Sequence, residues 1–367
     1  MNELLLKTSI DWPQRWLRLF RRPFRQYAIR KELVGHTTFA ERLLTQLARD
    51  GDVELATFYI TRVQQTRSGV IVAFTDRQSA LRPALVLKLP LTVKADQSTN
   101  EHRQALIGLH QLPALQSFAT HIPRPIAWGS FEERPYYLET ALAGESCVHL
   151  VRTQVDPTAL LQNAANLIMQ LHKGTMCRLI IDDVLFAQLV GDDLSMLRQL
   201  VLHWPDAALL ERKLQALEIL LRRGMYQQEL PLSWSHGDFW PGNILIESAT
   251  GQPKGIIDWD RARPLQQPLL DLLHLLAYTR KIRLRTQLGE EIVNCLLPAA
   301  FEQHKYELID SAVEALGLPS TFEFLQASVW LYWVRFAAAN LSRYPAFQAD
   351  QRWLSKNVFL VLKEGLR

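Results

Sequence analysis

Short runs in the first part of the chain alternate apolar and polar residues in the manner of strands. The runs ATFYITRV (56–63), GVIVAFT (69–75) and ALVLKLP (84–90) are rich in β-branched and aromatic residues, and polar turn segments separate them. Two further runs, PIAWGS (125–130) and PYYLETA (135–141), have the same character. This pattern predicts consecutive antiparallel strands.

Other segments carry apolar residues at helical spacing. Thr38 and Glu41 form a capping box, which predicts a helix that begins at this point. Segment 98–112 has apolar residues on one helical face, with Ser98 or Thr99 as its expected N-cap. A helix therefore lies between the third and fourth predicted strands.

The pattern changes near residue 144, where long helical segments such as DPTALLQNAANLIMQLHKG replace the strands. A chain of 367 residues exceeds the usual size of one domain. We therefore predict an α+β fold with an N-terminal extension (1–50), a small antiparallel β-rich lobe (51–143) and a larger, mainly helical lobe (144–367).

The composition is that of an ordinary globular protein, with 48% hydrophobic and 21% charged residues, which excludes a fibrous or disordered chain. The net charge of +4 is widely spread, so we expect no nucleic-acid partner. We find no apolar run of about 18 residues and no signal-peptide pattern. Three scattered cysteines favour a reducing compartment. We expect a cytoplasmic protein without a transmembrane segment.

The segment RWLRLFRRPFRQYAIRK (15–31) mixes seven basic residues with large apolar ones. Such a segment can rest on an anionic membrane surface, which would make the protein a peripheral membrane protein. Pro23 interrupts the helix that this would need. We favour the alternative that the segment packs on its own domain.

The helical lobe is interrupted once, by the segment SWSHGDFWPGNILIESATGQPKGIIDWD (233–260). NILIE and GIIDW read as two strands of an antiparallel hairpin, so Asn243 and Asp258 at its open ends become neighbours. An amide oxygen beside a carboxylate suits Mg²⁺. Asp238 lies in the preceding loop, where it can orient an attacking hydroxyl and accept its proton. Each fragment alone also suits a surface turn, but their joint spacing favours phosphoryl transfer.

HGDFWPGN followed by IIDWD resembles the signature of the aminoglycoside phosphotransferase and choline kinase-like family, over roughly residues 55–280. The resemblance implies a bilobal protein-kinase-like fold and an ATP- or GTP-dependent kinase of small hydroxylated molecules. It implies Asp238 as the catalytic base and His236 as the residue that braces the catalytic loop. It also implies Asn243 and Asp258 as Mg²⁺ ligands.

The resemblance implies further residues in the nucleotide-binding lobe. Lys88 would contact the nucleotide phosphates, and Glu101 would hold Lys88 by an ion pair, although a glutamate in a first helical turn is favoured by the helix dipole alone. A full glycine-rich motif is missing, so Ser68 and Gly69 are the candidates for backbone contacts to phosphate. The hinge from Leu138 to Ala141, with Glu139 inside it, would offer backbone groups to adenine.

We expect a small-molecule hydroxyl acceptor such as a sugar, an amino alcohol or an aminoglycoside-like compound. The aromatic-rich segment 322–344 is a candidate acceptor surface, but aromatic residues at helical spacing are more often core. Two alternatives stay open: a protein Ser/Thr kinase-like enzyme, and a non-catalytic nucleotide-binding scaffold. The residue pattern does not distinguish ATP from GTP and does not set the oligomeric state.

Overall fold

The computed structural model describes residues 35–51, 58–66, 69–76, 83–154, 156–299 and 307–366. The basic segment 15–31 and Ser68 lie outside these residues. The chain divides into two compact units, the first containing described residues up to Asp96 and Ile126–Ala141, the second containing Gln97–Pro125 and the residues from Leu142 onward. No helix in the described ranges has the length and apolar character needed to cross a membrane.

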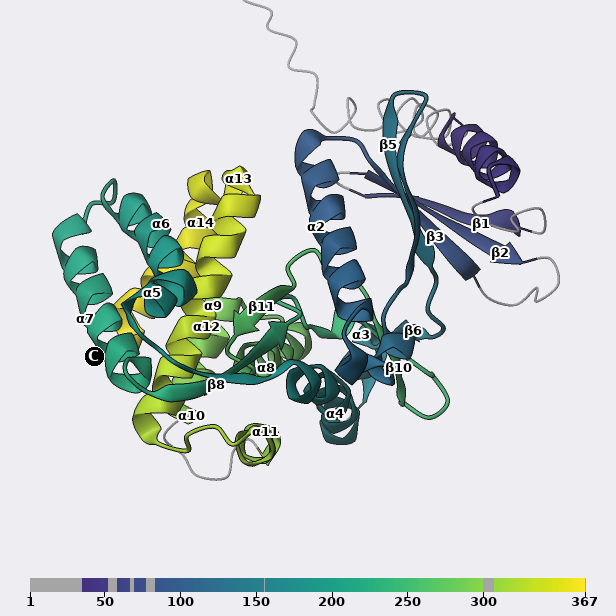
Figure 1. Cartoon of the computed structure of the whole chain (residues 1–367). Coiled ribbons are helices and arrows are strands. Elements are labelled where there is room, and N and C mark those ends of the chain that lie inside the picture. The colour runs from purple at the N-terminus through teal and green to yellow at the C-terminus, as the bar shows by residue number, and fades with distance from the viewer. Residues whose placement is uncertain are drawn as a thin grey trace, which may run out of the picture. The chain divides into compact units, whose positions relative to one another are not determined.

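The first unit is built on a five-stranded sheet whose strands run in the order β1-β2-β3-β5-β4 (Figure 1). Strands β1, β2, β3 and β5 pair antiparallel in that order. The strands are β1 Phe58–Gln65, β2 Gly69–Asp76, β3 Pro83–Pro90, β4 Pro125–Phe131 and β5 Arg134–Thr140. All five strands predicted from the alternating pattern are present.

One face of this sheet packs on the helix formed by residues 35–49. Leu85, Leu87 and Leu89 of β3 join Phe39 and Leu43 of the helix in one buried cluster. Because successive side chains of a strand point to opposite faces, Lys88 projects from the other face of the sheet. The alternating residues of β3 therefore place the core of this unit on one face of the sheet and Lys88 on the other face.

The second unit is mainly helical and contains two small sheets, β10-β9-β6 and β11-β8-β7. Its strands are β6 Glu145–Ser146, β7 Cys177–Ile180, β8 Glu229–Ser235, β9 Ile244–Ile246, β10 Pro253–Ile256 and β11 Arg263–Gln266. Its α-helices are α3 Val148–Thr153, α4 Thr158–Thr175, α5 Asp183–Phe186, α6 Asp192–Val201, α7 Ala207–Met225, α8 Leu269–Leu284, α9 Leu288–Glu291, α10 Leu297–Ala299, α11 Glu307–Leu316, α12 Phe322–Arg343, α13 Pro345–Ala349, α14 Gln351–Leu354 and α15 Leu360–Gly365. Short 3₁₀ and π segments complete it: η2 Pro113–Leu115, η3 Phe118–His121, η4 Ala187–Gly191, η5 Pro241–Asn243, η6 Ile292–Leu296 and η7 Ser355–Phe359. A β-rich unit and a mainly helical unit confirm the predicted α+β fold class.

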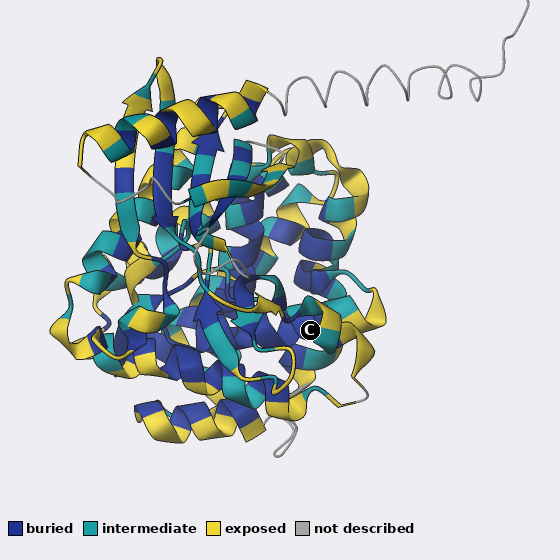
Figure 2. Cartoon of the chain, turned by 90° about the vertical axis from the view of Figure 1, so that its right-hand side faces the viewer, coloured by how far each residue is buried: buried dark blue, intermediate teal, exposed yellow. Residues whose placement is uncertain are grey.

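The core of the second unit is formed by the inner faces of these helices, which appear dark blue in Figure 2. Trp330 and Trp333 of α12 are fully buried in it. The aromatic residues at these two positions are therefore core residues, as their helical spacing favoured.

Helix α2, Val93–His110, differs from its prediction. The helix begins before Ser98. Thr92 caps its first turn, since the Ala95 N–H donates to Thr92 Oγ1 at 3.1 Å. The two units also divide the chain differently from the predicted lobes of residues 51–143 and 144–367. The reason is that the buried face of α2, with Leu106 and Leu109, belongs to the core of the helical unit.

The packing of α2 can be tested by substituting Leu106, which is 0% exposed. We expect Leu106→Ala to lower the free energy of unfolding by about 2–5 kcal/mol, because it leaves a cavity in the larger core. Urea titration followed by tryptophan fluorescence measures the change. Val93 on the same helix is 88% exposed, so Val93→Ala is the matched control and should change stability by less than about 0.5 kcal/mol.

Candidate functional site

Strand β8 carries the chain into the loop that contains His236, Gly237 and Asp238. Gly237 has φ of 75°, a left-handed conformation that side chains disfavour. A Cβ atom at this position would lie 2.4 Å from the backbone oxygen of Arg261. The glycine of the HGD motif is therefore required by both the turn and the close approach of the next loop.

A buried carboxylate on helix α8 holds this turn. Asp271 is 1% exposed and accepts the His236 N–H through Oδ2 at 2.8 Å and the Gly237 N–H through Oδ1 at 2.9 Å. A buried carboxylate is costly unless donors surround it, and two backbone N–H groups supply them. Asp271 therefore has a structural role, which is to hold this turn of the loop.

His236 connects the loop to Ile257, directly after the second strand of the hairpin. Its ring lies between the Ile257 carbonyl, 3.0 Å from Nε2, and the Asp238 N–H, which donates to Nδ1 at 3.2 Å. Burial lowers the pKa of His236 despite the nearby carboxylates, so the ring is neutral and donates from Nε2. The side chain lies where the predicted brace of the catalytic loop needs it.

Asp238 is surrounded by donors. His274 Nε2 lies 3.2 Å and an Arg261 nitrogen 3.7 Å from its Oδ1. Asn243 Nδ2 donates to Oδ2 at 3.3 Å and to the Asp238 backbone oxygen at 3.0 Å. Burial acts to raise the pKa of Asp238, but the His274 contact and the Arg261 charge outweigh it and hold the pKa well below its ordinary value. Asp238 is ionised at neutral pH.

The predicted hairpin is present and brings Asn243 opposite Ile257, the neighbour of Asp258. Strands β9 and β10 pair antiparallel, with Ile244 opposite Ile256, and the Ile257 N–H donates to the Asn243 carbonyl at 2.9 Å. Asn243 uses its amide nitrogen on Asp238, and within the described part of the chain its Oδ1 has no donor and stays available as an acceptor. An amide oxygen and the exposed Asp258 carboxylate are hard donors, and two protein ligands with phosphate and water suit Mg²⁺. The described residues contain no group of three or more His, Cys, Asp or Glu side chains that would form a complete protein cage for a metal.

Asp258 occupies a strained backbone position with φ of 73°. Its neighbours hold it there. The Trp259 N–H donates to buried His102 Nδ1 at 2.9 Å, and the Trp259 indole donates to the Ile256 carbonyl at 2.9 Å. Fixing the backbone on both sides of Asp258 presents its carboxylate at the loop surface.

In the first unit, Lys88 forms an ion pair that the sequence did not indicate. Its Nζ lies 3.0 Å from Glu139 Oε1, and the Glu139 side chain is only 5% exposed. Val86 pairs with Glu139 and Lys88 with Tyr137 across β3 and β5, so both charges project from the same face. Glu139 was predicted for its backbone, whereas its side chain makes this contact.

The remaining predicted nucleotide residues have local partners. The Gly69 N–H donates to Thr66 Oγ1 and the Ala141 N–H to the Ala84 carbonyl, so these two donors are engaged within the sheet. Gly69 also lies against β3, where a Cβ atom would come within 2.6 Å of the Leu89 carbonyl oxygen. Glu101 lies on α2 in the second unit and accepts a hydrogen bond from Gln97 Nε2. Its ion pair with Lys88 stays a prediction.

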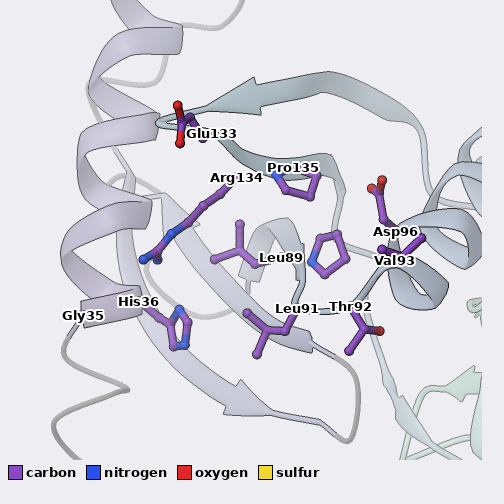
Figure 3. Close-up of a pocket in the computed structure, with 11 residues that line it drawn as sticks. Gly35, His36, Leu89, Leu91, Thr92, Val93, Asp96, Glu133, Arg134 and Pro135 are labelled. Atoms are coloured by element: carbon purple, nitrogen blue, oxygen red, sulfur yellow. The ribbon is translucent and has the colours of Figure 1, made fainter.

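A cavity of about 650 Å³ lies in the first unit, beside the end of β3 and the start of α2 (Figure 3). Arg134, His36 and Leu89 are among the residues that line it. None of the predicted nucleotide or metal residues that the structure describes lines this cavity, so we do not place phosphoryl transfer there.

Three residues of the site were missed from the sequence: His102, Arg261 and His274. A usable signal existed for the two histidines, because each lies on the apolar face of a helix, where a polar group must find a partner. His274 also follows Asp271 by three residues and so shares its helix face. Arg261 has no such signal, since its contact depends on the path of the loop.

The model of the phosphotransferase enzyme family (APH) matches residues 61–306, more than half of the chain. The chain therefore belongs to this family and is a small-molecule phosphotransferase. No curated protein sequence gives a significant match.

Solved structures of the same kind are similar to the chain. An aminoglycoside phosphotransferase, APH(3'')-Id from Streptomyces rimosus, in complex with ADP and streptomycin, is 16% identical, with 79% of this chain and 96% of that chain covered and a TM-score of 0.44. A glucosamine kinase is 18% identical, with coverage of 89% and 84% and a TM-score of 0.45. A spectinomycin phosphotransferase in complex with ADP and spectinomycin is 13% identical, with coverage of 83% and 88% and a TM-score of 0.44.

The role of Asp271 can be tested by Asp271→Asn, which replaces one acceptor oxygen by an N–H donor facing a backbone N–H. We expect a loss of about 1–3 kcal/mol in the free energy of unfolding, together with reduced phosphotransfer. Thermal unfolding and turnover measure the two effects. Asp192→Asn, on the exposed surface of α6, is the matched control and should change neither.

Two buried histidines predict an acid-sensitive fold. Burial lowers the pKa of both His236 and His172, so each is neutral in the folded state and takes up a proton more readily when unfolded. Their contribution to stability is complete above the unfolded pKa of about 6.5 and is lost as the pH falls below it, by up to about 1.4 kcal/mol per pH unit for each group. Urea unfolding at pH 7.5, 6.5 and 5.5 measures this slope, and a stability that is level over this range would contradict it.

Proposed function

We propose that the chain transfers the γ-phosphate of ATP to a hydroxyl of a small molecule, with Mg²⁺ bound by Asn243 and Asp258. The observation that carries the proposal is the Asp238 carboxylate, which is ionised, largely buried and held by Asn243 beside the end of the hairpin. That is the arrangement a phosphotransferase needs to orient a hydroxyl near bound phosphates.

In the proposed reaction, the acceptor oxygen forms a bond to the γ-phosphorus as the bond to the bridging β-γ oxygen breaks. ADP leaves with that electron pair, and the acceptor proton passes to Asp238. His236 and Asp271 keep the loop in place during this step. Mg²⁺, when bound, neutralises the phosphate charge.

Lys88 is proposed to bind the nucleotide phosphates from the first unit. Its ion pair with Glu139 supports this, because a buried carboxylate fixes the position of the ammonium group. Glu101, Ser68, Gly69 and the Ala141 carbonyl remain proposed contacts. GTP is an alternative nucleotide.

Two paired carboxylates of the second unit bear on the acceptor. Asp260 pairs with Arg343, and Asp193 with Arg335, so these carboxylates are neutralised within the protein. A polycationic acceptor needs unpaired carboxylates. We therefore favour a sugar or an amino alcohol over an aminoglycoside-like compound as the acceptor.

The test is a nucleotide-consumption screen with ATP and GTP over glucose, glucosamine, choline, ethanolamine and kanamycin. We expect turnover with a sugar or amino alcohol that stops when EDTA removes Mg²⁺. Asp238→Asn should lower turnover by about 10²–10⁴-fold because it removes the proton acceptor, while nucleotide binding is retained.

Asp192→Asn is again the matched control, with turnover expected at the wild-type rate. Full phosphorylation of the acceptor by Asp238→Asn would disprove the proposed role of Asp238. Labelled phosphate appearing on polypeptides and on no small molecule would disprove the proposed acceptor class.

A further inference from the structure

Helix α8 places a histidine directly against the proposed base. His274 Nε2 lies 3.2 Å from Asp238 Oδ1, and the side chain is only 7% exposed. Its other ring nitrogen, Nδ1, lies 3.3 Å from the hydroxyl of Tyr332 on α12. Three side chains from the catalytic loop and two helices therefore form one line, from Tyr332 through His274 to Asp238.

Tyr332 and His274 share a hydrogen bond, and His274 meets Asp238 as a close nitrogen–oxygen contact. Burial raises the pKa of Tyr332 well above its ordinary value, so its hydroxyl keeps its proton and is a donor. The carboxylate oxygens of Asp238 are hydrogen-bond acceptors. A His274 ring that accepts from Tyr332 at Nδ1 has its N–H at Nε2, on the side of Asp238, so the tyrosine favours this tautomer.

The ring of His274 is also fixed by packing. Tyr278, one turn further along α8, lies with its ring centroid 4.4 Å from that of His274 at an interplanar angle of 33°. The Tyr332 ring meets His274 edge to face at 5.7 Å. With a neighbouring oxygen close to each ring nitrogen and two aromatic rings packed against it, His274 has little freedom to turn.

These contacts distinguish the two oxygens of Asp238. Oδ1 faces both His274 and Arg261, whereas Oδ2 receives, among the described residues, only the Asn243 amide. A carboxylate oxygen has two acceptor directions, so Oδ2 keeps one of them for an incoming hydroxyl. A partial rotation of the carboxylate would move its oxygens away from His274 and from the Asn243 amide and lose this arrangement.

We propose that His274, held by Tyr332, is a positioning residue that fixes the Asp238 carboxylate so that Oδ2 faces the acceptor hydroxyl. This inference rests on the proposed function, in which Asp238 receives the acceptor proton. His274 touches neither the acceptor nor the nucleotide in this role. It acts through the geometry of Asp238 alone.

The experiment compares four full-length variants: His274→Leu, His274→Gln, Tyr332→Phe and the double variant His274→Leu with Tyr332→Phe. Turnover is measured with the acceptor of the above panel that gives the highest rate, or as ATP hydrolysis by water if none does. His203→Leu, at an exposed position of the second unit, is the matched control.

We expect His274→Leu to lower kcat by about 100-fold, the scale of a misplaced reacting group, and to leave the KM for ATP unchanged. His274→Gln should recover much of kcat, because its amide nitrogen can contact Asp238 in place of Nε2. Tyr332→Phe should lower kcat less, and should add nothing to His274→Leu, because its hydrogen-bond partner is already absent.

Wild-type kcat in His274→Leu, equal losses in the Leu and Gln variants, or independent losses at His274 and Tyr332 would each overturn the inference. Thermal unfolding of every variant identifies a failure to fold. If a His274 variant fails to fold, Tyr332→Phe, which removes only one oxygen, still tests the inference. Asp238→Asn separates the two proposals. If it is inactive while His274→Leu is fully active, the proposed function stands and only this inference fails.

Discussion

The hydrogen bonds from the His236 and Gly237 backbone to Asp271 are the constraint on which the site depends. The loop turns through a left-handed glycine, and the buried Asp271 carboxylate holds that turn from helix α8. The carboxylate requires the two N–H donors, because a buried charge without donors is strongly unfavourable. The two N–H groups in turn require an acceptor. Helix α8 and the loop therefore stabilise each other.

From this turn, a series of backbone hydrogen bonds continues to the proposed metal ligands. His236 links the loop to the Ile257 carbonyl, and Ile257 in turn donates to the carbonyl of Asn243. His102 of α2 fixes the far side of Asp258 through the Trp259 N–H. The proposed base and metal ligands therefore share one hydrogen-bonded frame, so a displacement of one loop would be transmitted to the others.

The sequence predicted the strands well and the helix ends less well. Alternation was a sufficient signal for β1 to β5, because one face of their sheet is buried against a helix. The start of α2 was misjudged because Ser98 is a good capping residue in isolation. In the structure its hydroxyl donates to Asp260 instead, and Thr92 serves the first turn of the helix.

The sequence alone determined the residues whose proximity is local: the hairpin that joins Asn243 to Asp258, and the loop that carries Asp238 five residues before Asn243. A short hairpin brings its ends together whatever surrounds it. The tertiary structure alone decided the partners of these residues, His102, Arg261, His274 and Tyr332, and the pairing of Lys88 with Glu139. Those contacts join strands, loops and helices far apart in the chain, or depend on a loop's exact path, and only the packing of the cores sets which side chains meet.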